Sequence, residues 1–216
     1  MAKGLTGLKR GKPDVKLAMN NESQGDKRLP VEAQVTGMLT DVIVSIPQSE
    51  ERLSPRPDVR STELIKKAST TTASISGGAA LVPGPLGLLT ILPDMYAIWR
   101  IQAHLVADIA AVYGKTGTLG KEQMIWCLFK HSAAHVAGDF VVQVGERYIV
   151  HPRSLQWIQK AVGLLGIKIA QRVLGKSVAR FLPILGAAAV ARYAYIDTKK
   201  VGLAAMSLFS KEIVIE

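Results

Sequence analysis

The sequence predicts an all-α protein, a helical bundle around a central apolar helical hairpin that glycine and proline interrupt. No charged residue occurs between Ala68 and Pro93, and this stretch is as long as a bilayer crossing. Hydrophobic residues make up 48% of the 216 residues, and the mean hydropathy is +0.21. These values lie toward the apolar side of soluble proteins. The apolar surface is therefore expected either to be buried in a protein core or to contact lipid.

The first 58 residues are expected to form a flexible basic region and linker, followed by a helical domain over 59–216. Residues 1–30 mix charged, polar and glycine residues without periodicity. They contain no apolar run of the signal-peptide kind, so we expect the chain not to be exported by the usual route. The later run from Val42 to Ile46 suits a helical turn or a short strand, and its length does not decide between them.

The central hairpin is predicted as two helices, from about Arg60 to Leu81 and from about Leu86 to Tyr113. The first arm is rich in serine and threonine and ends in the small residues Gly77 to Ala80. Pro83-Gly84-Pro85 then interrupts the chain, because proline removes a helical hydrogen bond and clashes with the preceding turn. Pro93 is expected to kink the second arm or to begin a new segment. The pattern leaves open whether this hairpin is buried in protein or inserted part-way into lipid.

Three further helical segments are expected in the C-terminal half. The first spans 120–137, and residues 138–150 are expected to continue as helix, although their valines also suit a strand. The second runs from about Ser154 to Leu174. The third, a helix or helical pair, covers about 176–210 and contains the run Gly186 to Ala189. Such small residues let helices approach closely, so we expect these segments to pack on the hairpin through glycine and alanine.

The net charge of +10 lies mostly in the C-terminal half, where residues 113–216 carry 14 basic and 6 acidic residues. Such a field attracts anionic lipid head groups or nucleic acid. Aromatic residues make up only 6% of the chain and no recognition motif occurs, so specific nucleic-acid binding is not expected. The expected partners are an anionic membrane surface, a membrane protein, or both.

Residues 76–114 combine a Gly-Gly pair, a Pro-Gly break, a Pro-Asp step and a Tyr-Gly end, and residues 182–209 contain a Pro-x-x-Gly helix followed by an alanine-rich end. Both segments resemble the EcsC family, and the first also resembles the YcjF-like domain of GTPase-associated bacterial membrane proteins. The second segment departs from the family pattern at Arg192, where asparagine is frequent. The matching positions of the first segment are Gly77, Gly78, Pro83, Gly84, Pro93, Asp94, Gln102, Ile109, Ala110, Tyr113 and Gly114.

The resemblance implies a helical domain over about residues 60–210 and a bacterial origin. It further implies a place at the cytoplasmic face of the inner membrane, where the protein would support a transport, secretion or GTPase-linked process. It implies no particular reaction and no cofactor.

Five polar residues lie along the second arm of the hairpin in apolar surroundings. Asp94 follows Pro93 and suits a first helical turn, where its charge meets the helix dipole and free N–H groups. Two of the others are four residues apart and share a helix face. A structural polar network is the main interpretation, and a ligand site is the alternative. The five residues are Asp94, Arg100, Gln102, His104 and Asp108.

Cys127, His131, His135 and Asp139 are four residues apart in turn, and all are metal-ligand types. On one helix, neighbours in this series share a face, while its ends diverge by about 120°. The series lacks the glutamate of the His-Glu-x-x-His motif, and a packing face is the main interpretation, with a metal site or an enzyme as the alternative. The cysteine stands among apolar residues and is expected to be an inert buried thiol. No nucleophile elbow or complete phosphate loop occurs, so no catalytic residue is predicted.

A cationic stripe is expected on the helix near 154–180. Beside it lie apolar residues at helical spacing, Ile158, Val162, Leu165, Ile169 and Val173, and together they give an amphipathic surface. This surface is either a solvated face over a protein core or a face turned to a membrane. The sequence favours a non-enzymatic, membrane-associated protein, with a metal-binding protein or enzyme and a soluble interaction module as alternatives. The basic residues are Lys160, Lys168, Arg172, Lys176 and Arg180.

Overall fold

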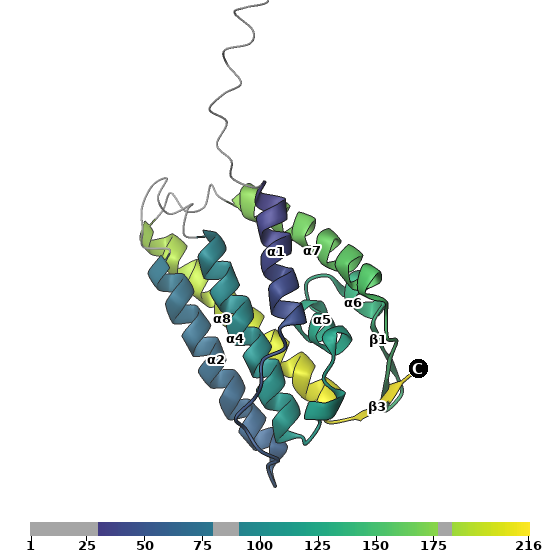
Figure 1. The fold of residues 1–216 in the computed structure, drawn as a ribbon. Helices are drawn as coiled ribbons and strands as arrows, with labels where there is room; N and C mark the ends of the chain where they lie inside the picture. The colour runs from purple at the N-terminus through teal and green to yellow at the C-terminus, as the bar shows by residue number, and fades with distance from the viewer. Residues whose placement is uncertain (1–29, 80–90, 177–182) are drawn as a thin grey trace, which may run out of the picture. The chain divides into compact units, whose positions relative to one another are not determined.

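The computed structural model describes residues 30–79, 91–176 and 183–216, and these residues are mostly helical (Figure 1). The expectation of a largely all-α protein is therefore confirmed. The predicted break at Pro83-Gly84-Pro85 lies outside the described residues.

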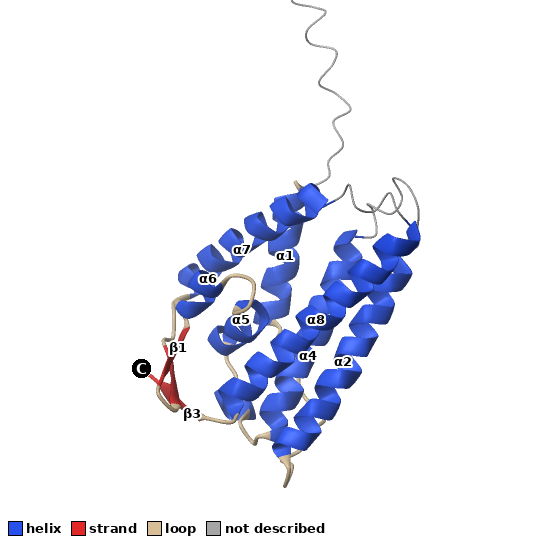
Figure 2. Ribbon diagram, turned by 180° about the vertical axis from the view of Figure 1, so that it is seen from behind, coloured by secondary structure: helices blue, strands red, loops and turns tan. Residues whose placement is uncertain are grey.

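Three long helices lie side by side and form one layer of the structure (Figure 1, Figure 2). They are α2 (Pro57–Ala79), α4 (Ile91–Val112) and α8 (Pro183–Phe209). Each of them packs on the other two. None of the described helices has the combination of length and apolar character that crossing a membrane requires.

Helix α2 carries many hydroxyl side chains, and several of them donate to the carbonyl four residues earlier in the same helix, so these hydroxyl groups need no partner outside the helix. The buried side of the helix carries Ser69, Thr72 and Ser76, which are small enough to let α8 come close. A Cβ atom at Gly77 would lie 3.3 Å from the Cβ of Ala191 on α8. The donors to carbonyls four residues earlier are Thr62, Thr70, Thr71 and Ser74.

Helix α1 (Val31–Val44) belongs to the packed body, although the sequence was expected to form a flexible region and linker up to residue 58. The compact unit begins at Val31. Apolar residues in α1 recur at spacings of four, three and one, which place them on one helix face. This face packs on α7 (Leu155–Lys176) and on α4. The residues on it are Val35, Leu39, Val42 and Ile43, all fully buried.

The expected helix over 120–137 is two shorter helices, α5 (Lys121–Phe129) and α6 (Ala134–Gly138). The chain turns between them, because the amides of Ser132 and Ala133 both donate to the carbonyl of Phe129. A short 3₁₀ turn, η1 (Thr116–Thr118), precedes α5.

The expectation of helix over 138–150 was wrong, because this segment forms the antiparallel strands β1 (Val141–Val144) and β2 (Arg147–Val150). β-branched valines favour a pleated strand, and Gly145 takes the positive φ of 59° that the two-residue turn requires. The C-terminal strand β3 (Glu212–Ile215) adds to the other side of β2 in parallel. The Tyr148 ring lies edge-on to Trp126 of α5, with 5.2 Å between the ring centroids, and this contact joins the sheet to the helices.

Candidate functional site

The five polar residues of α4 do not converge on one site. Asp94 lies in the first turn of α4, as its place after Pro93 predicted, and it is buried. His104 is exposed, and Asp108 accepts a hydrogen bond from Ser49 Oγ at 2.6 Å. Although His104 and Asp108 share a face of α4, Asp108 is hydrogen-bonded to Ser49 in the segment between α1 and α2.

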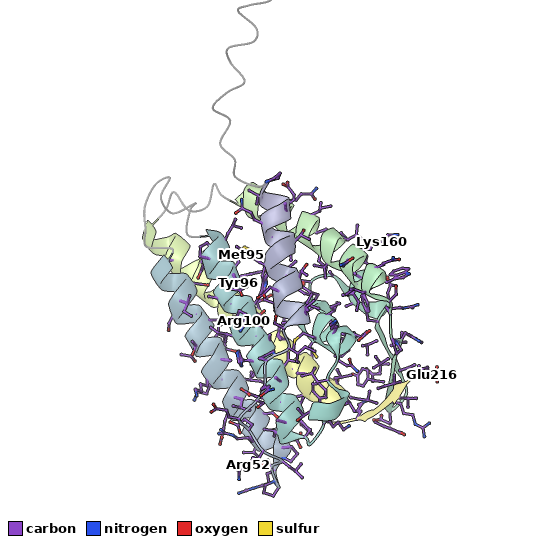
Figure 3. All side chains as sticks on the ribbon, in the orientation of Figure 1. Arg52, Met95, Tyr96, Arg100, Lys160 and Glu216 are labelled. Carbon is purple, nitrogen blue, oxygen red and sulfur yellow. The ribbon has the colours of Figure 1, made fainter. Side chains whose placement is uncertain are left out.

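Arg100 belongs to a separate surface cluster between α4 and α1. Its guanidinium lies 3.8 Å from the Asp41 carboxylate, to which the Tyr96 hydroxyl donates at 2.5 Å. Figure 3 shows Tyr96 and Arg100 on the part of α4 that runs beside α1. These contacts tie the two helices together at the surface.

The four residues at steps of four do not form a metal site. The turn after Phe129 ends the single helix on which their spacing depended, and no group of three metal ligands occurs in the part of the chain that the structure describes. Cys127 is fully buried, as the sequence predicted, and this burial raises the pKa of its thiol.

The remaining residues of that series bind in different directions. His135 Nε2 makes a hydrogen bond with Lys168 of α7 at 2.5 Å. The main-chain carbonyl of Asp139 accepts from the Arg153 guanidinium at 3.2 Å. His131 turns toward the layer of long helices.

His131 begins a chain of hydrogen-bonded polar groups that crosses from the α5–α6 turn into the layer of long helices. Its Nε2 lies 2.7 Å from one oxygen of Asp197 on α8, and Gln102 Nε2 of α4 donates to the other oxygen at 2.9 Å. Gln102 Nε2 also donates to Thr198 Oγ1 at 3.2 Å, and that hydroxyl lies 2.9 Å from Thr72 Oγ1 of α2. The chain therefore links the turn to all three long helices, and its inner members, Gln102, Thr198 and Thr72, are buried.

The orientation of His131 determines what this chain can do chemically. His131 Nε2 faces the Asp197 carboxylate and shares the proton of the hydrogen bond between them. The other ring nitrogen, Nδ1, is buried and has no hydrogen-bond partner among the described residues. A general base must present a lone pair within reach of its substrate, and this nitrogen does not reach the surface. The pair is thus a structural tie between α8 and the turn.

A shallow hollow opens at the surface end of this chain. Its volume is about 280 Å³. The walls come from α8 on one side and from the turn before α6 on the other. Tyr193 is 60% exposed and Ile196 is 39% exposed, so the rim is partly apolar. The lining residues are His131, Ser132, Tyr193, Ile196, Asp197 and Lys200.

A second candidate site is the outward face of α7. Trp157, Leu164 and Ile167 are 46%, 47% and 45% exposed. At 3.6 residues per turn these positions, with Lys160 between them, lie within about 80° of one another around the helix. The structure therefore exposes three large apolar side chains on one stripe of α7, which we call the α7 outer stripe: Trp157, Lys160, Leu164 and Ile167. Figure 3 shows Lys160 projecting outward from this helix.

The α7 outer stripe lies in a strongly basic stretch of chain. No acidic residue occurs between Glu146 and Asp197, and α7 itself has none. Two cations flank the exposed indole: Arg153 lies 5.6 Å and Lys160 Nζ 5.5 Å from the centroid of the Trp157 ring. Both cations therefore lie where a negatively charged surface would meet the indole.

Of the apolar residues expected beside the cationic stripe, those whose side chains the structure describes face the core. The side chain of Val173 lies outside the described part of the chain. Ile158, Val162 and Leu165 are buried, and Ile169 is partly buried against them. Of the two alternatives for this helix, the structure shows these residues packed on the protein core. The large apolar residues of the α7 outer stripe lie on another side of the helix, and the sequence analysis did not predict their exposure. They were detectable, because α7 carries apolar residues nearly all round, and an apolar residue opposite a core face must be exposed.

The predicted cationic stripe is described only in part. Lys160 is exposed, and Lys168 is half-buried at its contact with His135. The side chains of Arg172 and Lys176 lie outside the described part of the chain, as does Arg180 altogether.

Comparison with protein-family models, curated proteins and solved structures finds no match to the chain.

Proposed function

We propose that the protein is a non-enzymatic helical protein that docks on the cytoplasmic face of a bacterial membrane through the α7 outer stripe. In this role it supports a transport, secretion or GTPase-linked process. The single observation that carries the proposal is the exposure of Trp157, Leu164 and Ile167 on one face of a helix without acidic residues.

The apolar part of the proposal rests on where these side chains lie. Isolated exposed apolar residues are common on soluble proteins and need no partner. Three within a narrow stripe are a different case, because a helix with apolar and cationic residues on its outer face can lie in the interface of a bilayer. Tryptophan favours that region, since its ring is apolar and its N–H is polar.

The electrostatic part rests on the charges around the stripe. Arg153 and Lys160 stand beside the indole, and no carboxylate of α7 opposes them. A basic residue near an anionic leaflet contributes about 1 kcal/mol to binding. Long basic side chains can also keep their charge at the head groups while their methylene groups lie against apolar surface. An anionic surface therefore suits this face better than a neutral one.

The proposal includes an EcsC-type arrangement of the chain. In it the apolar hairpin, about residues 68–113, is the centre of a helical bundle and packs against the C-terminal helix through small residues. The close approach of α2 and α8 at Gly77 and the resemblance of residues 76–114 support this arrangement.

Co-sedimentation of the full chain with vesicles tests the docking. We expect binding to vesicles that contain phosphatidylglycerol, and weaker binding as salt rises, because the Debye length falls from about 10 Å at 0.1 M to about 3 Å at 1 M. Lys160→Glu is expected to weaken binding about fivefold or more, since it removes one attraction and adds one repulsion. Ile167→Asp is expected to weaken binding through the apolar part of the stripe.

Two matched variants on α2 control for general effects. Lys66→Glu changes the net charge by the same amount as Lys160→Glu. Val59→Asp replaces an exposed apolar side chain outside α7 by a carboxylate, as Ile167→Asp does within α7. Both are expected to bind as the unchanged protein does. Equal losses in Lys66→Glu and Lys160→Glu would show that net charge, and not α7, decides binding. No binding to any vesicle would instead favour the soluble interaction module.

A further inference from the structure

We propose that the hollow beside α8 binds a small amphiphilic anion, with its carboxylate or phosphate group at Lys200 and its apolar part on Tyr193 and Ile196. This ligand site is separate from the α7 outer stripe and does not depend on membrane docking.

The charge of the ligand follows from the groups around the hollow. Lys200 is exposed and makes no ion pair with any residue in the described ranges. Asp197 is the only acidic residue of α8, and both its oxygens already accept hydrogen bonds, from His131 and from Gln102. The oxygens of Asp197 therefore have partners already, and the group in the wall whose charge meets no partner among the described residues is the Lys200 ammonium.

The apolar part of the ligand follows from the rim. Tyr193 and Ile196 stand one helical turn apart on α8, and Lys200 follows one turn later, so the three share a face. Their exposed surfaces would be covered by an alkyl or aryl group attached to the anion. Known ligand pockets begin at about 300 Å³, and this hollow is slightly smaller, so the ligand is expected to be small.

The hollow also differs from a simple charged surface in being held open by a fixed wall. The bond between His131 and Asp197 spans from the α5–α6 turn to α8, and Gln102 fixes the carboxylate from below. The wall therefore does not need to rearrange when a ligand binds, which lowers the entropic cost of binding.

An NMR titration of the full chain with octyl phosphate below its micelle concentration tests the site, with inorganic phosphate as the second probe. We expect saturable shifts centred on Ile196 and Lys200 for octyl phosphate, and weaker binding of inorganic phosphate. Lys200→Ala is expected to weaken binding about fivefold, the effect of one exposed ion pair. Lys199→Ala is the matched control, because that side chain is also exposed but does not line the hollow.

The proposal is overturned if neither probe gives saturable shifts, or if Lys200→Ala and Lys199→Ala have the same effect. Equal affinity for the two phosphates would overturn the amphiphilic ligand in favour of a free phosphate.

Discussion

Replacing Gly166 by alanine tests the closest approach of α7 to the rest of the body. A Cβ atom at Gly166 would lie 2.2 Å from Thr36 Oγ1 and 3.2 Å from the Cα atom of the same residue on α1. Rotation of the threonine side chain cannot remove the second contact, because Cα belongs to the backbone. The added methyl group must therefore push α1 and α7 apart, and such overpacking costs about 1–3 kcal/mol.

Gly163→Ala provides the control within the same helix. No atom lies within 4 Å of a Cβ built at Gly163. Both substitutions gain about 1 kcal/mol of helix propensity, so this contribution cancels when the two variants are compared. The free energy of unfolding of Gly166→Ala should then be lower than that of Gly163→Ala by about 1–3 kcal/mol. For a body of this size that difference corresponds to about 2–12 °C in Tm.

Thermal unfolding followed by circular dichroism measures this difference. We expect Gly163→Ala to melt above the unchanged protein and Gly166→Ala to melt clearly below Gly163→Ala. Adding Thr36→Ala to Gly166→Ala should restore part of the loss, since it removes the hydroxyl from the contact. Equal melting temperatures for the two alanine variants would refute the close packing of α1 on α7.

Three further predictions concern the interior and the loops. Thr198→Val removes a buried hydroxyl that bonds to Thr72 and Gln102, so the free energy of unfolding in urea should fall by about 1–2 kcal/mol; an unchanged value would mean that this contact is not formed. Cys127 should resist iodoacetamide in the native protein and react in denaturant, as mass spectrometry would show, and rapid native labelling would contradict its burial. The hydrogen bond from Arg60 lowers the pKa of Glu51 in the folded state, so this pair stabilises the fold above the unfolded-state pKa of about 4.3, and its contribution disappears as the pH falls through the folded pKa. The Tm difference between the unchanged protein and Glu51→Gln should accordingly be larger at pH 7 than at pH 3, and a difference independent of pH would count against the pair.

The helices that the sequence predicted well are those whose signals are local. The helix expected from about Arg60 is α2, which begins a little earlier, at Pro57, where proline suits the first helical position. The apolar periodicity of α7 likewise depends only on neighbouring residues. Helix α1 also has a local signal, because Val35, Leu39 and Val42 recur at helical spacing. The apolar run from Val42 to Ile46, taken alone, does not indicate this helix. The β-hairpin had a local signal too, since strand-forming residues stand on both sides of the turn at Gly145, from Val141 to Val144 and from Tyr148 to Val150.

The candidate site was less predictable, because its partners are far apart in the chain. His131 meets Asp197 across 66 residues, and no periodicity connects the two. The sequence instead suggested Cys127 and His135 as neighbours of His131, because residues four apart share a face of one helix. That relation requires a single helix to continue through all three residues. The turn after Phe129 removes that condition. The local spacing of residues therefore marked His131 as a candidate but could not indicate Asp197, the carboxylate that it binds.

The exposed indole of Trp157 gives the most direct measurement of the proposed docking. The other two tryptophans, Trp99 and Trp126, are buried, so a quencher in the acyl region of a bilayer should reach Trp157 alone. With phosphatidylglycerol vesicles that carry brominated acyl chains, we predict loss of the Trp157 fluorescence and no loss in Trp157→Phe. Undiminished fluorescence at vesicle concentrations that saturate co-sedimentation, or equal quenching in Trp157→Phe, would contradict the insertion of the α7 outer stripe.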